Sequence, residues 1–496
     1  MKKLVALVFA LFTLIFISGC GVGGDDLSKI SKTIPTYNMD IVYNDEEKKL
    51  EVNQVLDYIN TYDTSLDEIY LHLYPKSFNL DAVNKPVGVL TKEKAYYNGD
   101  SEGDILIADV KCDAEVEAIT YTGDDEDFLK IELTSAVAPG ERLQVEFDYE
   151  VVIPNCNHRF GYGENTINLG NFYPVLAVFE DGQYSLNPYH SNGDPFYSEV
   201  ANYNVTITAP EKYIIASTGS MTDSSVVDGV QTVSYEAKVC RDYAFVMSEK
   251  YSVASTTIEG VEVMYYYYED DNYEKHLQAS VDALVTFNEL FGRYPYSTLS
   301  VAKTNFVHGG MEYPNLVYIS DDDMADADYI NVIVHEIAHQ WWYGVVGNDE
   351  YVNSWLDEGL TEFSTNLFYE NNPSYGVNAD DVVKNLTKNY ATFVDVYSTI
   401  LGEVDTSMNR ALDEYDTEPE YVYVTYVKGN LFFNSLREMI GKDKFMQGLK
   451  EYYNEYKYLV ATPEGMMGVF EGVTGTDLSQ FFSSWIEGKI DIIEIK

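Results

Sequence analysis

Two histidines and a glutamate stand in an H-E-x-x-H pattern, His335-Glu336-Ile337-Ala338-His339, within an apolar stretch that favours a helix. Residues four apart share one helical face, with Cβ atoms about 5–6 Å apart, so both histidines can reach one metal ion. Glu336 then lies beside them, where it can hold a water molecule and take its proton. The alternative is a buried helix with two satisfied histidines, but the chain has only 7 histidines, which makes this spacing unusual by chance.

A third ligand must come from elsewhere, because catalytic zinc usually takes three protein ligands and leaves one position open. Glu358 is the candidate, since it follows His339 after 18 intervening residues and stands early in a second helical pattern. The set H-E-x-x-H, 18 residues and then Asp357-Glu358-Gly359 resembles the aminopeptidase N family of zinc metallopeptidases, the gluzincins. The resemblance implies one zinc ion per chain, bound by His335, His339 and Glu358, with Glu336 transferring the proton.

Two further acidic residues lie near these ligands in the sequence. Asp357 stands where relatives often have Asn, and it receives no chemical role. Glu362 lies one turn after Glu358 on the same helical face. It is either a hydrogen-bond acceptor for a ligand histidine or a solvated surface residue, and the sequence leaves both open.

Upstream of the zinc motif, Gly309-Gly310-Met311-Glu312-Tyr313 resembles the family's Gly-x-Met-Glu-Asn exopeptidase motif. The resemblance implies that Glu312 binds the free α-ammonium group of a peptide. It also implies that Gly309, Gly310 and Met311 line the substrate cleft. Tyr313 departs from the family pattern, in which Asn is usual.

Downstream, Tyr426-Val427-Lys428-Gly429 resembles the family's Tyr-x-Lys-Gly, whose tyrosine hydroxyl stabilises the oxyanion. Tyr421 and Tyr423 are close enough to compete for this role, but the following Lys-Gly favours Tyr426. Relatives also contribute a Gln or Glu from the β domain. Here that residue falls within 164–174, where Glu164 or Asn168 can serve, and a structural loop is an equal alternative.

The hydrophobic period changes near residue 250 and divides the chain. Residues 40–250 show short alternating strands between Gly, Pro and Asn turns, which predicts an all-β sandwich or saddle domain; Leu50 to Asn60 is a weaker stretch that can form a short helix. Residues 251–496 mix strands with longer helical patterns, such as Tyr273 to Phe291. The expected class is α+β. The family resemblance implies a thermolysin-like catalytic domain that is mixed α/β first and helical afterwards.

The first twenty residues resemble a bacterial lipoprotein signal peptide. A basic start and an apolar run lead to Ile17-Ser18-Gly19-Cys20, in which Cys20 becomes the lipidated residue. An ordinary cleaved signal peptide is the alternative. Residues 21–39 are then expected to form a flexible tether, and the enzyme is expected to be lipid-anchored outside the cytoplasmic membrane of a bacterial cell.

Composition excludes several partners. The formal net charge of −49 argues against nucleic acid and against adhesion to anionic lipid through a basic patch.

No C-x-x-C pair supports a thiolate metal site, and Cys156 and Cys240 are either a disulfide or two free thiols.

We therefore expect a zinc aminopeptidase that hydrolyses the N-terminal bond of peptides. The alternatives are a zinc endopeptidase on the same scaffold and a non-catalytic peptide-binding surface lipoprotein. The sequence leaves side-chain specificity and oligomeric state open.

Overall fold

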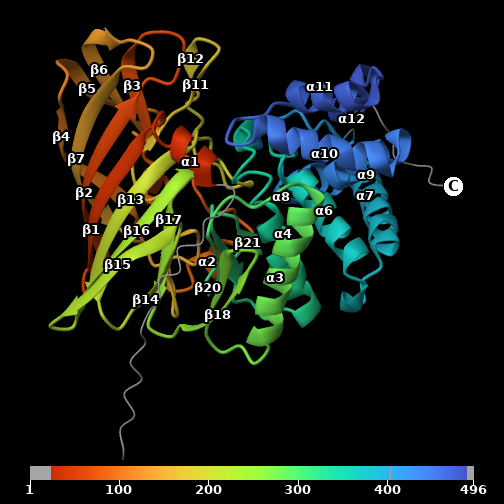
Figure 1. The fold of residues 1–496 in the computed structure, drawn as a ribbon, viewed down its shortest axis with the longest axis horizontal. Coiled ribbons are helices and arrows are strands. Elements are labelled where there is room, and N and C mark those ends of the chain that lie inside the picture. The colour runs from red at the N-terminus through yellow and green to blue at the C-terminus, as the bar shows by residue number, and fades with distance from the viewer. Residues whose placement is uncertain (1–23, 403, 489–496) are drawn as a thin grey trace, which may run out of the picture.

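The computed structural model describes residues 24–402 and 404–488. The expected signal peptide and its Cys20 lie outside these residues. Within the described ranges, no helix combines the length and apolarity that a membrane span needs. The predicted α+β class is confirmed: β-sheets fill one side of the molecule, and the helices of the C-terminal half gather on the other (Figure 1).

The N-terminal half is built around a seven-stranded sheet. Every neighbouring pair is antiparallel except β1 and β13, which run parallel. Alternate residues of β1, β2 and β7 are buried, as expected of a sheet with one solvated face. Its order is β15 (Ser220–Val227), β16 (Val230–Cys240), β13 (Ala201–Pro210), β1 (Thr36–Asn44), β2 (Lys49–Ile59), β7 (Arg142–Val152) and β4 (Asp104–Cys112).

Smaller sheets complete this half. One has the order β10 (Val175–Leu176), β3 (Leu66–His72), β6 (Phe128–Val137) and β5 (Val116–Thr122). Another has the order β14 (Ile214–Ser217), β17 (Ala244–Ser248), β9 (Ile167–Gly170) and β8 (Phe160–Tyr162). A hairpin, β11 (Phe179–Glu180) and β12 (Gln183–Tyr184), and the short helix α2 (Lys92–Ala95) lie between strands.

Two local predictions for this half are wrong. The stretch Leu50 to Asn60 is strand rather than helix, because its alternating residues pair along β2 with both β1 and β7. The predicted tether over 21–39 is not an open linker where it is described. It contains helix α1 (Gly24–Ile30), and β1 begins at Thr36. Leu27, Ile30 and Ile34 pack against the core, which explains why this stretch has a defined structure.

The C-terminal half begins with a five-stranded sheet of order β18 (Ser252–Ile258), β19 (Val261–Tyr267), β20 (Thr298–Thr304), β22 (Leu316–Ser320) and β21 (Gly310–Met311). Helix α3 (Tyr273–Leu290) agrees closely with its prediction and packs against α4 (Asp326–Ala338). The strand β21 forms the edge of the sheet beside α4. This edge and α4 are the elements that carry the predicted exopeptidase and zinc motifs.

Helices make up the rest of the chain. The set is α5 (Glu350–Asn353), α6 (Glu358–Asn371), α7 (Ala379–Leu401), α8 (Glu418–Val422), a π-helical segment η4 (Tyr423–Lys428), α9 (Gly429–Ile440), α10 (Lys442–Tyr456), α11 (Pro463–Thr474) and α12 (Ser479–Ile486). The backbones of α6 and α9 meet at Gly359 and Gly429, where a Cβ on Gly429 would lie 2.7 Å from the Gly359 Cα. Only glycine permits this approach, which brings Glu358 close to η4.

The buried side chain of Arg241 joins the two halves. Its guanidinium group donates to the carbonyl oxygen of Ser198 in the N-terminal half. It also donates, at 2.9 and 3.0 Å, to the carbonyls of Tyr343 and Leu459 in the C-terminal half. Gly347 leaves the space for it, because a Cβ there would lie 2.1 Å from the Arg241 Cζ. These bonds join the two halves, together with others such as the one from Tyr343 to Asp242.

Cys112, Cys156 and Cys240 are free thiols. The disulfide alternative for Cys156 and Cys240 is therefore not adopted in this structure.

Candidate active site

Three ligand atoms converge between α4 and α6. The Nε2 atoms of His335 and His339 lie 3.1 Å apart, and Glu358 Oε2 lies 3.2 and 3.1 Å from them. All three side chains are buried. A tetrahedral zinc ion with bonds of about 2.0–2.1 Å holds its ligands about 3.3 Å apart, so the observed spacing fits this ion. These three buried electron-pair donors can therefore hold one metal ion between them.

The neighbours of the histidines orient their Nε2 atoms toward this point. His339 Nδ1 lies 3.0 Å from the Trp342 carbonyl and 3.2 Å from the Thr361 hydroxyl. Glu362 Oε1 lies 3.4 Å from His335 Nδ1. This contact has no hydrogen-bond geometry, so the structure places Glu362 beside the histidine as an ion-pair neighbour and leaves the acceptor role a prediction. An acceptor on Nδ1 leaves the Nε2 lone pair free for a metal ion.

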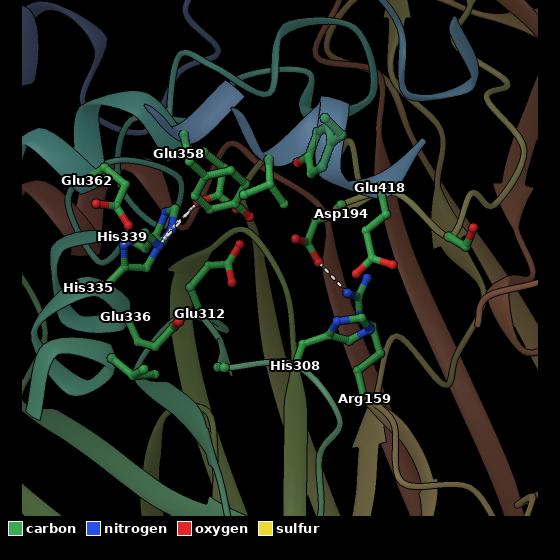
Figure 2. Close-up of a pocket in the computed structure, with 18 of the residues that line it drawn as sticks. Arg159, Asp194, His308, Glu312, His335, Glu336, His339, Glu358, Glu362 and Glu418 are labelled. Carbon is green, nitrogen blue, oxygen red and sulfur yellow. Dashed lines mark hydrogen bonds and ion pairs between the residues drawn. The ribbon is translucent and has the colours of Figure 1, made fainter. Parts of the chain in front are cut away.

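Glu336 projects into the same cavity beside the ligands (Figure 2). Burial raises the pKa of its carboxyl group to about 7, although His335 and His339 act in the opposite direction. Its Oε2 has no hydrogen-bond partner among the described residues. Gly310 makes room for this side chain, because a Cβ at Gly310 would lie 2.3 Å from Glu336 Oε1.

Glu312 lies at the centre of the pocket, just beyond the sheet edge formed by β21 (Figure 2). Its side chain is buried, and its Oε1 has no hydrogen-bond partner in the described part of the chain. Burial, followed by the charges of Asp194 and Glu336, raises its pKa well above the ordinary range. A carboxyl group surrounded in this way is a strong site for a cationic group that enters the pocket.

The residues around Glu312 divide between the two faces of the strand. Gly309 and Gly310 line the pocket, as expected. The prediction that Met311 also lines it is wrong: Met311 is fully buried in the core. Successive residues of a strand point to opposite faces, so the glutamate and the methionine cannot both face the cleft. Tyr313, which replaces the usual Asn, donates to Asn171 of the β half at 2.9 Å.

Tyr426 approaches the site from the π-helical segment η4. Its hydroxyl group donates to Glu358 Oε1, and its ring lies parallel to the His335 ring at 6.1 Å. Tyr421 also lines the pocket, whereas Tyr423 stacks on Phe393 of α7. Tyr426 is thus the tyrosine of the three that contacts a predicted ligand.

The β half contributes pocket residues that sequence reasoning missed. Arg159 Nη2 lies 2.7 Å from an Asp194 carboxylate oxygen, and both side chains line the cavity of about 240 Å³ (Figure 2). Glu164 and Asn168, the candidates from this half, do not line it. Asn168 instead donates to the carbonyls of His158 and Asn305. No local motif marks Arg159 or Asp194, because the two meet only through the fold of separate loops.

Residues 275–485 match the family model described as the peptidase family M1 domain. The chain carries an M1 peptidase domain. Human endoplasmic reticulum aminopeptidase 2 is 23% identical over 381 residues, which cover 70% of this chain and 37% of that protein. Mouse aminopeptidase B is 30% identical over 184 residues, or 35% of this chain and 27% of that protein. The chain thus spans about a third of the length of the curated relatives that it matches.

Solved structures share the fold over nearly the whole chain. The M1 zinc metallopeptidase from Deinococcus radiodurans aligns with a TM-score of 0.63 at 16% identity, covering 92% of this chain and 94% of that one. A mutant form of that enzyme bound to a Tyr-Ser-Ala substrate aligns with a TM-score of 0.60 at 15% identity, with the same coverage. The likeness extends through both halves, so the two-part architecture is common to both proteins.

Proposed function

We propose that this protein is a zinc-dependent aminopeptidase that removes residues from the free N-terminus of peptides. The observation that carries the proposal is the unpartnered carboxyl group of Glu312, buried beside a complete three-ligand site. A metal site alone is compatible with many hydrolases, but an adjacent buried acid selects substrates with a free ammonium group. The names of the curated relatives and the peptide held by the Deinococcus structure support the same activity.

Each residue of the pocket then has a defined task. His335, His339 and Glu358 would hold the zinc ion, which would polarise the scissile carbonyl and acidify the attacking water. Glu336 accepts a proton from that water and delivers it to the departing amine. Tyr426 donates a hydrogen bond to the carbonyl oxygen as negative charge develops on it. Glu312 binds the α-ammonium group, and the absence of side chains on Gly309 and Gly310 opens the cleft beside the sheet edge.

The proposal is tested with free and N-acetylated aminoacyl arylamides, with and without a chelator. We expect turnover of the free substrates only, its loss on chelation, and its recovery with one equivalent of zinc. A Glu336→Gln variant should bind zinc as the wild type does and lose turnover, because its three ligands remain. Full activity in that variant would remove Glu336 from the mechanism.

The same panel separates the two alternatives. Cleavage of acetylated substrates at comparable rates would favour an endopeptidase on this scaffold. Binding of peptides without turnover, in protein shown to contain zinc, would favour a non-catalytic peptide-binding lipoprotein.

We also propose that the enzyme is anchored by lipid at Cys20, on the outer face of the membrane. The support is the sequence Ile17-Ser18-Gly19-Cys20 after an apolar run, and nothing beyond the sequence bears on it. Expression in a bacterium with labelled fatty acid is expected to label the wild type and not Cys20→Ser. Equal labelling would contradict the anchor, without affecting the proposed activity.

A further inference from the structure

Most charges that line the pocket have a partner. Glu358 contacts His335 and His339, the other two proposed zinc ligands, and Glu362 lies against His335. Asp194 is paired with Arg159, the single Arg or Lys in the pocket lining. In the proposed function, Glu312 binds the substrate ammonium and Glu336 exchanges a proton with water. The carboxylates of the lining are Asp194, Glu312, Glu336, Glu358, Glu362 and Glu418.

Glu418 is the one carboxylate of the lining to which neither a partner nor a role has been assigned. It is half-buried at the start of α8, and no hydrogen bond or ion pair joins its side chain to any described residue. Burial raises the pKa of Glu418, and no neighbouring cation lowers it. Burial also lowers the pKa of His308 to about 4, so this nearby ring is neutral and does not offset the charge.

The position of Glu418 indicates which part of a peptide can reach it. Figure 2 shows His335 and His339 at one side of the pocket, Glu312 between, and Glu418 on the far side with His308 and Arg159. A peptide whose amine is at Glu312 and whose first carbonyl is at the zinc ligands has no further backbone on the far side. Only the side chain of its first residue can extend there.

The lining of the pocket includes surface that suits a long side chain with a polar end. Pro86, Tyr421 and Val422 contribute apolar surface to the lining, and Ser191 and Gly193 leave it open. Lys and Arg side chains bury their methylene groups along such surface while the charged end remains at a polar group.

We propose that this pocket selects peptides whose first residue is Lys or Arg, with Glu418 binding the side-chain cation. The inference rests on the proposed aminopeptidase function and adds its substrate class. Arg159 could in principle favour an acidic first residue, but Asp194 already neutralises it at 2.7 Å. An acidic side chain would instead add a charge to a pocket that has one carboxylate without a partner.

The test compares lysyl and norleucyl arylamides, whose side chains share a four-carbon stem and differ in the ammonium group. In the zinc-loaded full chain we expect kcat/KM to be about tenfold or more higher for lysine, as for a charge-assisted hydrogen bond. Glu418→Gln should lower the Lys/norleucine ratio by about tenfold, and Glu418→Lys should bring it below one.

Glu464→Gln is the matched control, because Glu464 also lies in the first turn of a helix capped by a threonine but is exposed outside the pocket lining. It should keep the wild-type ratio. A wild-type ratio near or below one, or an unchanged ratio in Glu418→Gln, would overturn the inference while any turnover leaves the aminopeptidase proposal intact. Absence of turnover with every free aminoacyl substrate would instead refute the proposed function itself.

Discussion

Replacing Gly310 by alanine tests how strongly activity depends on the position of the Glu336 carboxyl group. A Cβ at this position would lie 2.3, 2.4 and 2.5 Å from Oε1, Cδ and Cγ of Glu336. The φ angle of Gly310 is outside the left-handed region, so alanine fits the backbone itself. The three nearest contacts thus all belong to the Glu336 side chain, and we expect the fold and the zinc ligands to be retained.

The size of the effect follows from these contacts. Ordinary contacts begin near 3.4 Å, so the Glu336 carboxyl group must move by about 1 Å. A displacement of this size in a catalytic group costs about 10²-fold in rate. We expect kcat of Gly310→Ala to fall by about 10²-fold on a free aminoacyl arylamide. Zinc content and the thermal unfolding midpoint should stay close to those of the wild type.

Gly309→Ala provides the comparison, because a Cβ at Gly309 meets only Val332, at 3.6 and 3.8 Å. Its loss of kcat should be much smaller than that of Gly310→Ala. Wild-type kcat in Gly310→Ala, or a loss that follows the loss of zinc, would refute the argument from Glu336.

Two further predictions concern the segment η4. Tyr426→Phe should lower kcat by about 10²–10³-fold with zinc retained if its hydroxyl is a single oxyanion donor, and an unchanged kcat would exclude it from the mechanism. Burial lowers the pKa of Lys428 from 10.5 to about 7, and its amine donates to the carbonyls of Thr406 and Trp485. Between these values the unfolded chain binds more protons, so stability rises with pH by up to about 1.4 kcal/mol per unit. Urea unfolding from pH 7 to 9 should show this rise in the wild type and a flatter dependence in Lys428→Met; equal slopes would contradict it.

The parts of the site that could be predicted are those whose geometry is local. His335, Glu336 and His339 share one helix, so their relative positions follow from 3.6 residues per turn. Glu358 and Tyr426 come from other elements, and their prediction depended on family spacing rather than on any local rule. Met311 shows the limit of predicting roles from a family motif. The motif implied that Met311 lines the cleft, but the alternation of side chains along the strand turns it into the core.

The elements of the fold likewise divide into those that local sequence predicts and those that it does not. Long amphipathic patterns such as α3 were predicted closely, because their period reflects burial on one side. Leu50 to Asn60 was assigned wrongly, because its short run carries the two periods about equally and tertiary pairing with β1 and β7 decides between them.

The sequence did not predict Arg159, Asp194 or Glu418 as pocket residues. The reason also bears on how substrate specificity can change. None is fixed by a repeating element: Arg159 and Asp194 stand on loops of the β half, and Glu418 begins a short helix. The residues proposed for catalysis and zinc binding belong to α4 and its C-terminal cap, α6 and η4, and α6 packs on both α4 and η4. Because Arg159, Asp194 and Glu418 lie outside the elements that carry the proposed zinc ligands, we expect substitutions on the far wall of the pocket to alter the accepted first residue without moving those ligands. Specificity should therefore vary among chains of this architecture more readily than the chemistry does.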